Sequence, residues 1–270
     1  MDLPRLFISM LLFPLIGGGC RPKTETIDAL VVDLGRPETV EDARGRLARI
    51  GLPVIPHLIK ALNDPNPMTR TNAVWTLGSI PESRKTSAPH LIAALDDPDG
   101  LFRSALIWEL GRIGRPVDKL FPLFVRHLDD EHVRTRVNAA DALVRLEQNQ
   151  DLRLRDIPLD KILQVLSAAM AEEDVWPPCH AAPVLTALGP RARPAIPALL
   201  HALHHTHFLA RIEAGRTLHL IEPQRDPEIV EAVTPALNAD GPWTEPAAVK
   251  LLTEIGTFEA RKALERHGAQ

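Results

Sequence analysis

The sequence is poor in the side chains on which β-sheet proteins depend. It contains no tyrosine, and aromatic residues make up only 4% of the chain. Because strands are enriched in aromatic and β-branched side chains, this composition favours a helical protein. Cysteine is also scarce, since Cys20 and Cys179 are too few for a disulfide framework. Cys179 has no C-x-x-C partner, and we interpret it as a packing residue.

A surplus of positive charge is missing as well. The formal net charge is -4, and the isoelectric point is about 6.3. A protein that binds nucleic acid or an anionic membrane surface usually carries clustered lysine and arginine. We therefore expect no nucleic-acid partner.

Motifs for catalysis and cofactor binding are absent too. The sequence has neither a glycine-rich phosphate loop between a strand and a helix nor a G-x-S-x-G motif. His201 and His205 have the helical spacing of a metal site, but no H-E-x-x-H motif is present, and a solvated loop suits this cluster, which includes His204 and His207, better. We expect a protein without catalytic residues, cofactor or metal, and we keep metal binding by the histidines as an alternative.

What the sequence does contain is an internal repeat. Three segments align without gaps at a spacing of 33 residues, and a fourth copy follows further along the chain. Each copy begins with a proline and has an arginine 14 residues later: Pro56 and Arg70, Pro89 and Arg103, Pro122 and Arg136, Pro197 and Arg211. Two anchors that keep one separation in four copies indicate a repeated structural unit.

Weaker copies extend the pattern to about seven units. Leucine or isoleucine recurs 7 and 10 residues after the arginine position, and the steps between units are 30, 33, 33, 42, 33 and 34 residues. The long step contains a polar insertion, residues 147–158. Each unit is predicted to form two helices, the first starting at the proline and the second carrying the arginine. Acidic residues recur at the turn between them, which indicates helix capping.

The repeat resembles the HEAT repeat superfamily, particularly its short bacterial form with the pattern P-x-L-x-x-x-L-x-D-x-x-x-x-V-R-x-x-A-x-x-A-L-x-x-I-G. The resemblance covers nearly all of residues 26–258 and implies an all-α, right-handed solenoid. It also implies a binding function, with the second helix of each unit lining a concave surface. One branch, the phycocyanobilin lyase relatives, handles a bilin chromophore, but the repeat alone does not carry that activity.

The N-terminal residues 1–20 are typical of an export signal. An apolar run after Arg5 ends in three glycines and Cys20, and it is too short to span a bilayer. This ending resembles a bacterial lipobox, although Gly17 stands where leucine is preferred. The resemblance implies lipidation of Cys20, a short tether over residues 21–25, and a location in the bacterial cell envelope at a periplasmic or outer-membrane face. An ordinary cleaved signal and secretion are the alternative.

One position of the repeat suggests a binding patch. The residue five places after the arginine position is usually polar and exposed in this family, but here it is Trp75 and Trp108 in consecutive units. Aromatic and arginine side chains dominate binding hot spots. The predicted patch on the concave face comprises Trp75, Trp108, Arg112, Asp141, Arg145 and Arg216. The alternative is that both tryptophans fill a groove between neighbouring repeats.

These observations together predict an interaction scaffold that is anchored to a membrane through Cys20 and holds a protein or peptide partner. Residues 259–270 are expected to be the end of a terminal helix and a tail. A chromophore-handling or small-molecule-handling protein, like the lyase relatives, is the alternative function. The partner cannot be named from a solenoid fold, since the fold alone does not determine function.

Overall fold

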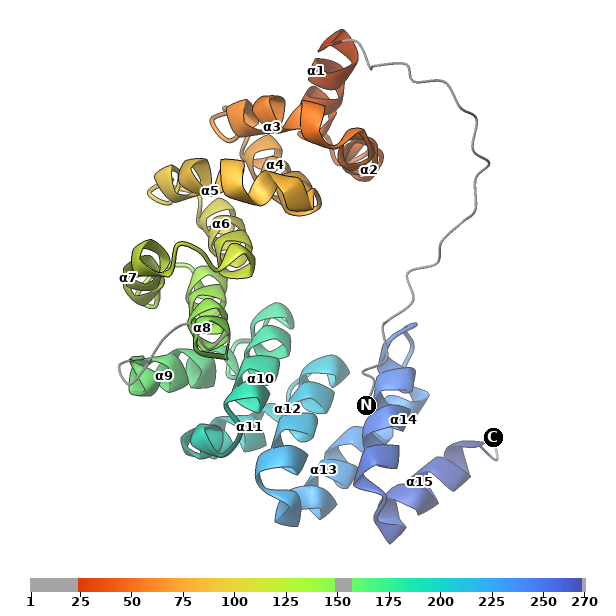
Figure 1. Cartoon of the computed structure of the whole chain (residues 1–270). Helices are drawn as coiled ribbons and strands as arrows, with labels where there is room; N and C mark the ends of the chain where they lie inside the picture. Colours follow the sequence, from red (N-terminus) through yellow and green to blue (C-terminus); the bar gives the residue numbers. More distant parts are fainter. Residues whose placement is uncertain (1–23, 149–156, 269–270) are drawn as a thin grey trace.

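The computed structural model describes residues 24–148 and 157–268, and these residues form helices and connecting turns without any strand. The helices stack in pairs along a curved arc (Figure 1). The predicted all-α solenoid of about seven two-helix repeats is therefore confirmed. The predicted export signal, Cys20, most of the predicted tether and residues 149–156 of the insertion lie outside the described residues.

The first helix of each pair lies on the outer, convex side of the arc (Figure 1). These helices are α1 (Thr24–Asp33), α3 (Ile55–Ala61), α5 (Arg84–Ala93), α7 (Val117–His127), α9 (Leu159–Ala169), α11 (Ile196–Ala202) and α13 (Asp226–Val233). Short 3-10 turns precede or follow several of them: η1 (Leu52–Val54), η2 (Pro81–Ser83), η3 (Gly189–Ala195), η4 (Pro223–Arg225) and η5 (Thr234–Asn238).

The second helix of each pair lines the inner, concave side (Figure 1). These helices are α2 (Val40–Ile50), α4 (Pro67–Gly78), α6 (Gly100–Ile113), α8 (Val133–Gln148), α10 (Trp176–Leu188), α12 (Phe208–Ile221) and α14 (Thr244–Ile255). A further helix, α15 (Phe258–Gly268), packs on α14 at the C-terminal end. No helix in residues 24–148 or 157–268 has both the length and the apolar character needed to cross a bilayer.

Two outer helices begin earlier than the repeated proline predicts. Pro56 and Pro197 occupy the first turn of α3 and α11, as expected, but α5 and α7 start five residues before Pro89 and Pro122. An internal proline removes one intrahelical hydrogen bond and crowds the preceding turn. The segments before these two prolines are nevertheless helical, whereas the segment before Pro56 forms a 3-10 turn.

Polar side chains at the turns start the inner helices. Asn66 caps α4 by accepting a hydrogen bond from the Met68 amide, and Asp99 caps α6 by accepting from the Leu101 and Phe102 amides. The aspartates two residues before each cap close the turn, because Asp97 accepts from the Asp99 amide in the same way that Asp64 accepts from Asn66. The predicted capping role of the repeated acidic turn is thus visible in the hydrogen bonds.

Two of the repeated arginines, Arg70 and Arg103, tie successive turns together. Arg103 donates to the carbonyls of Asp97 and Pro98 in its own turn and to the carboxylate of Asp130 in the next. Arg70 makes the equivalent contact to Asp97 at 3.1 Å. Arg70 and Arg103 therefore lock consecutive turns of the solenoid.

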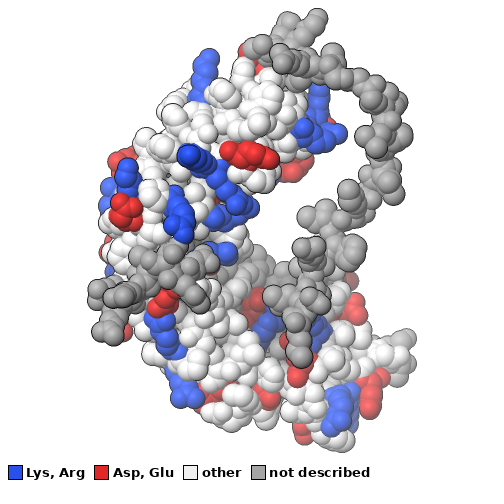
Figure 2. Space-filling view, in the orientation of Figure 1, with Lys and Arg blue, Asp and Glu red and all other residues white. Residues whose placement is uncertain are grey.

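The core runs continuously through the stack. Phe102 and Phe124 are fully buried, and so are Ala73, Ala139 and Ala214 of the inner helices, whose small side chains let these helices approach closely. Charged side chains of both signs cover the face shown in Figure 2, with lysine and arginine gathered over α5 and the end of α6. Each unit buries its apolar face only against the units before and after it, so contacts between neighbouring repeats stabilise the fold.

Candidate functional site

Three tryptophans from three different inner helices line one groove on the concave face. Trp75 comes from α4, Trp108 from α6 and Trp176 from α10, and the groove has a volume of about 390 Å³. Its remaining lining consists of Thr71, Leu101, Ser104, Arg134, Asn138 and His180. Because the inner helices stack in the same register, side chains at equivalent repeat positions come together along this face.

The first two tryptophans are half-buried. Trp75 packs against the hydrophobic core, and Trp108 lies at the same repeat position one unit on. Both indoles also line the groove. The sequence left two hypotheses open, packing between repeats and contact with a ligand. The structure shows features of both for these two side chains.

Trp176 is fixed by a stack within its own helix. Its indole lies 3.9 Å from the imidazole of His180, measured between ring centroids, with an angle of 14° between the planes. His180 Nδ1 donates to the Trp176 carbonyl at 2.9 Å. Burial lowers the pKa of His180 below its usual value of 6.5, so the ring is neutral at pH 7. The Arg134 guanidinium lies 4.8 Å from the Trp176 ring centroid and adds a cation–π contact.

A charged pair lies beside Trp108. Arg145 Nε donates to the Asp141 carboxylate at 2.6 Å, and the Arg145 guanidinium lies 5.4 Å from the Trp108 ring centroid. Burial raises the pKa of Asp141, although the hydrogen bond from Arg145 opposes this shift. The predicted residues Trp108, Asp141 and Arg145 thus form one contact chain.

Arg112 continues this surface towards the C-terminal end of α6. Arg112 and Arg145 line a second, smaller cavity of about 280 Å³. Arg112 also pairs with Glu109 at 3.0 Å, and burial raises the pKa of that carboxyl group. Arg216, in contrast, pairs with Glu213 on α12 and lines neither cavity. The structure therefore brings five of the six predicted residues together and leaves Arg216 apart from them.

Trp176, His180 and Arg134 were missed by the sequence reasoning. Relative to the arginine position, Arg134 and Trp176 stand two places before it, as does Leu101, and Asn138 and His180 stand two places after it. The leucine spacing already places Pro178 at the arginine position of the unit that contains Trp176. The predicted patch was drawn from columns further along the inner helix, so the columns two places before and after the arginine position were not considered.

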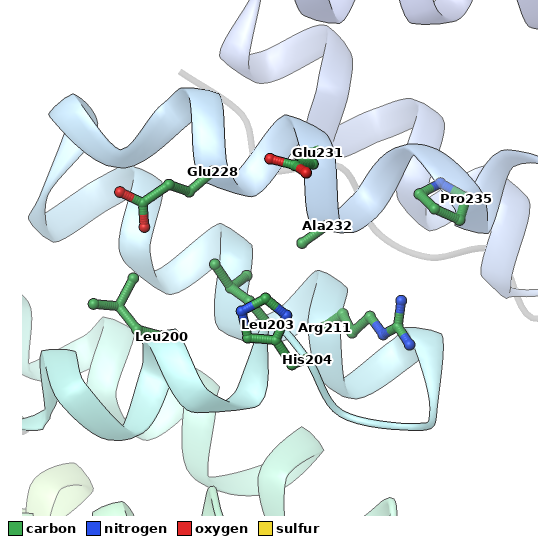
Figure 3. A pocket seen from close by; sticks show the side chains of 8 residues that line it. All are labelled: Leu200, Leu203, His204, Arg211, Glu228, Glu231, Ala232 and Pro235. Carbon is green, nitrogen blue, oxygen red and sulfur yellow. The ribbon is translucent and has the colours of Figure 1, made fainter.

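The histidine cluster lies mostly in the turn between α11 and α12. His205 Nε2 donates to the Glu172 carbonyl, and its Nδ1 accepts from the His207 amide, so both ring nitrogens are already used. His204 lines a groove between α11 and α13, where Glu228 and Glu231 face it (Figure 3). Within the residues that the structure describes, no three His, Cys, Asp or Glu side chains converge as metal ligands.

The thiol of Cys179 lies in α10 and is half-buried. Burial raises its pKa to about 11, and nearby carboxylates act in the same direction. A thiol in this environment is almost entirely protonated at neutral pH and therefore a poor nucleophile or metal ligand.

Comparisons with known proteins agree with this architecture. No curated protein matches the sequence. Among solved structures, Kap121p bound to the extreme C-terminus of the protein phosphatase Cdc14p is similar, with a TM-score of 0.61 and 14% identity over 86% of this chain. The chain spans only 29% of the length of Kap121p.

Two further structures are similar at a lower level. The complex of CpcE and CpcF of phycocyanin lyase from Nostoc sp. PCC7120 has a TM-score of 0.49 and 22% identity over 77% of this chain and 79% of that one. Human deoxyhypusine hydroxylase in complex with glycerol has a TM-score of 0.41 and 20% identity, over 90% of this chain and 89% of that one. At these identities a likeness reflects the fold alone.

The family comparison is more specific. The family model described as HEAT repeats matches residues 43–99 and 88–182, which together span more than half of the 270 residues. The two matches cover the three units that align without gaps, and they include all three groove tryptophans. The chain therefore belongs to the HEAT repeat family.

Proposed function

We propose that this chain is a non-catalytic scaffold that holds a protein or peptide segment in the concave groove. The observation that carries the proposal is the convergence of Trp75, Trp108 and Trp176 in one groove. Tryptophan and arginine are the residue types most enriched at the energetic centres of protein interfaces. Trp75 and Trp108 occupy a repeat position that is usually polar and exposed in this family, and Trp176 joins them from a third helix, which is hard to ascribe to packing alone.

The polar lining of the same groove suits a peptide. Thr71, Ser104 and Asn138 contribute hydroxyl and amide groups, and the amide of Asn138 already donates to Ser104. A bound peptide backbone needs such hydrogen-bonding groups, because burying an unpaired amide is costly. The similar fold of Kap121p, solved with the extreme C-terminus of Cdc14p, supports this use of the architecture.

The aromatic groove also supports a second candidate function. Its volume of about 390 Å³ lies within the usual range for small-molecule sites, which are mostly apolar with a few polar groups. A chromophore or other aromatic molecule is therefore the alternative ligand, and the lyase-like fold keeps this alternative in view. Purified protein with visible absorbance, or with an aromatic molecule released on denaturation, would favour it over the scaffold.

We extend the proposal to the location of the protein. Residues 1–20 would direct export, Cys20 would carry the lipid, and the solenoid would begin shortly after a tether near residues 21–25. The test is metabolic labelling with a radioactive fatty acid in a bacterial host. Lipidation predicts label in the parent and none in Cys20→Ser, whereas export by an ordinary signal predicts an unlabelled, secreted protein in both cases.

The binding proposal is tested by capture from native envelope extract. The baits are residues 21–270 as parent, the variant Trp75→Ala/Trp108→Ala, and the control Trp243→Ala, which removes a 72%-exposed indole that does not line the groove. A partner retained by the parent and by the control, but lost by the double variant, is the expected result.

The helical content of each bait has to be compared by circular dichroism. If Trp75→Ala/Trp108→Ala unfolds, the tryptophans are packing residues, and Trp108→Ala alone, which leaves the core contact of Trp75 intact, becomes the decisive variant. Equal capture of one partner by the parent and by a folded Trp108→Ala variant would contradict the proposal.

A further inference from the structure

A second groove, on the convex side of the solenoid, differs in chemistry from the tryptophan groove. It lies between the start of α5 and the connection from α6 to α7 and has a volume of about 650 Å³. Figure 2 shows lysine and arginine gathered over this part of the molecule. The charged side chains that line it are Arg84, Lys85, Arg115 and Lys119, and all four are cationic.

Most of these cations have no carboxylate partner within the described residues. Arg84, Lys85 and Lys119 are exposed, and none of the three takes part in an ion pair there, whereas Arg126 and Arg134 on neighbouring helices do. The positive charge of Arg84 acts to lower the pKa of Glu109. The Glu109 carboxylate, however, is only 1% exposed and is already paired with Arg112. At Arg84, Lys85 and Lys119 the rim therefore carries positive charge that no carboxylate of the described residues pairs with.

The floor of the groove is apolar. It is formed by Pro89 and Ile92 of α5 together with Ile113 and Pro116 at the connection. No hydroxyl or amide side chain lines it, and proline has no backbone N–H to donate. A peptide lying on this floor would leave its backbone amides unpaired, which is unfavourable. An alkyl chain has no such requirement.

The corresponding groove between α11 and α13 shows that the charge is not a general property of the fold. There, Glu228 and Glu231 of α13 face Leu200, His204 and Arg211 (Figure 3). Carboxylates of this kind repel an anion, so the α11–α13 groove does not share the purely cationic rim of the α5–α7 groove.

We propose that the groove between α5 and α7 binds a single-chain acyl anion, with its carboxylate or phosphate at the cationic rim and its alkyl chain on the apolar floor. The inference is independent of the partner-binding role of the concave face, since the two grooves share no residue. It names a ligand class for the largest of the cavities described above.

Calorimetric titration with monomeric laurate and dodecyl phosphate tests this assignment. The test variant is Arg84→Gln/Lys119→Gln, and the matched control is Arg193→Gln/Lys60→Gln, which removes the same charges from exposed positions outside the groove. Loss of two charge-assisted contacts should weaken binding at least about tenfold in the test variant and leave the control unchanged. Both variants alter exposed side chains and are expected to keep the parent's circular dichroism.

Several results would overturn the assignment. These are equal binding by the parent and the test variant, equal binding of the cationic analogue dodecyltrimethylammonium, or binding of phosphatidylglycerol vesicles without any binding of the monomeric anions. Displacement of laurate by an acidic peptide of equal or higher affinity would also contradict the choice of an acyl chain. Binding of laurate or dodecyl phosphate that is weakened at least about tenfold in Arg84→Gln/Lys119→Gln and is unchanged in the control would support it.

Discussion

Arg103 and Asp130, which are 27 residues apart in the sequence, form a two-pronged ion pair between consecutive repeat turns. Arg103 Nε and Nη2 donate to the two carboxylate oxygens at 2.9 and 2.8 Å, and the side chains are only 9% and 6% exposed. Breaking one partner of a buried pair leaves a desolvated charge without compensation. Removing one partner of the Arg103–Asp130 pair is therefore expected to destabilise the fold strongly.

Asp130→Asn should lower the free energy of unfolding by about 3 kcal/mol, because Arg103 would lose its buried counter-charge. The neighbouring change Asp129→Asn is the control, since Asp129 is 71% exposed and its pair with Lys161 is expected to contribute under about 1 kcal/mol. Urea unfolding followed by circular dichroism measures both. Equal losses of unfolding free energy in the two variants would show that the Arg103–Asp130 pair does not hold consecutive turns together.

A second prediction concerns pH and Glu109. Burial raises the pKa of this carboxyl group, with Arg112 and Arg84 acting in the opposite direction. A folded-state pKa above the unfolded value gives stability that is fully present below the unfolded pKa and is lost as pH rises through the folded pKa. Relative to Glu109→Gln, the parent should therefore lose stability as pH rises from about 4, near the unfolded pKa of glutamate, towards neutrality. A constant difference between the two proteins across that range would contradict the shift.

Two glycine substitutions should have opposite signs. At Gly111 in α6 an added Cβ would lie 2.9 Å from Ala142 Cβ and 3.4 Å from its Cα, so Gly111→Ala should destabilise the fold by about 1–3 kcal/mol through overpacking. At Gly45 in α2 nothing lies within 4 Å, so Gly45→Ala should stabilise it by about 0.5–1 kcal/mol. Thermal and urea midpoints of both variants check the pair, and stabilisation by Gly111→Ala would refute the close α6–α8 packing.

The thiol of Cys179 should be slow to react in the folded protein. With its pKa raised to about 11, the thiolate fraction at pH 7.5 is roughly 10²-fold lower than for an ordinary cysteine. In a Cys20→Ser background, alkylation by iodoacetamide should be correspondingly slow in buffer and fast in denaturant. Rapid alkylation of the native protein would show that Cys179 is exposed and activated.

The fold was predictable because its determinants are local and repeated. The proline and arginine anchors at a 33-residue spacing establish the units. Each repeated arginine donates to carbonyls of its own turn, and Arg70 and Arg103 also hold the next turn. The same regularity predicted that Trp75 and Trp108 would lie side by side. The early starts of α5 and α7 were not predictable, because a proline is compatible with either a first turn or an interior position.

The site was predictable only in part. Trp176 stands two places before Pro178, which takes the arginine position of its unit, whereas Trp75 and Trp108 stand five places after their arginines, so the repeat pattern did not group the three. Its stack on His180 depends on side-chain orientation, which residue spacing does not determine. The cationic groove between α5 and α7 was missed for a different reason. A net charge of -4 averages over the whole chain and conceals a local cluster of four cations.

The central claim, that a partner occupies the concave tryptophan groove, is tested most directly by tryptophan fluorescence. The chain has four tryptophans, and three of them line the groove. In the variant Trp243→Phe, all the emission therefore comes from the groove. Adding the captured partner should shift this emission to shorter wavelength and protect it from quenching by acrylamide. A partner that binds without changing either the emission or the quenching would contradict the claim, because the groove would still be open to water.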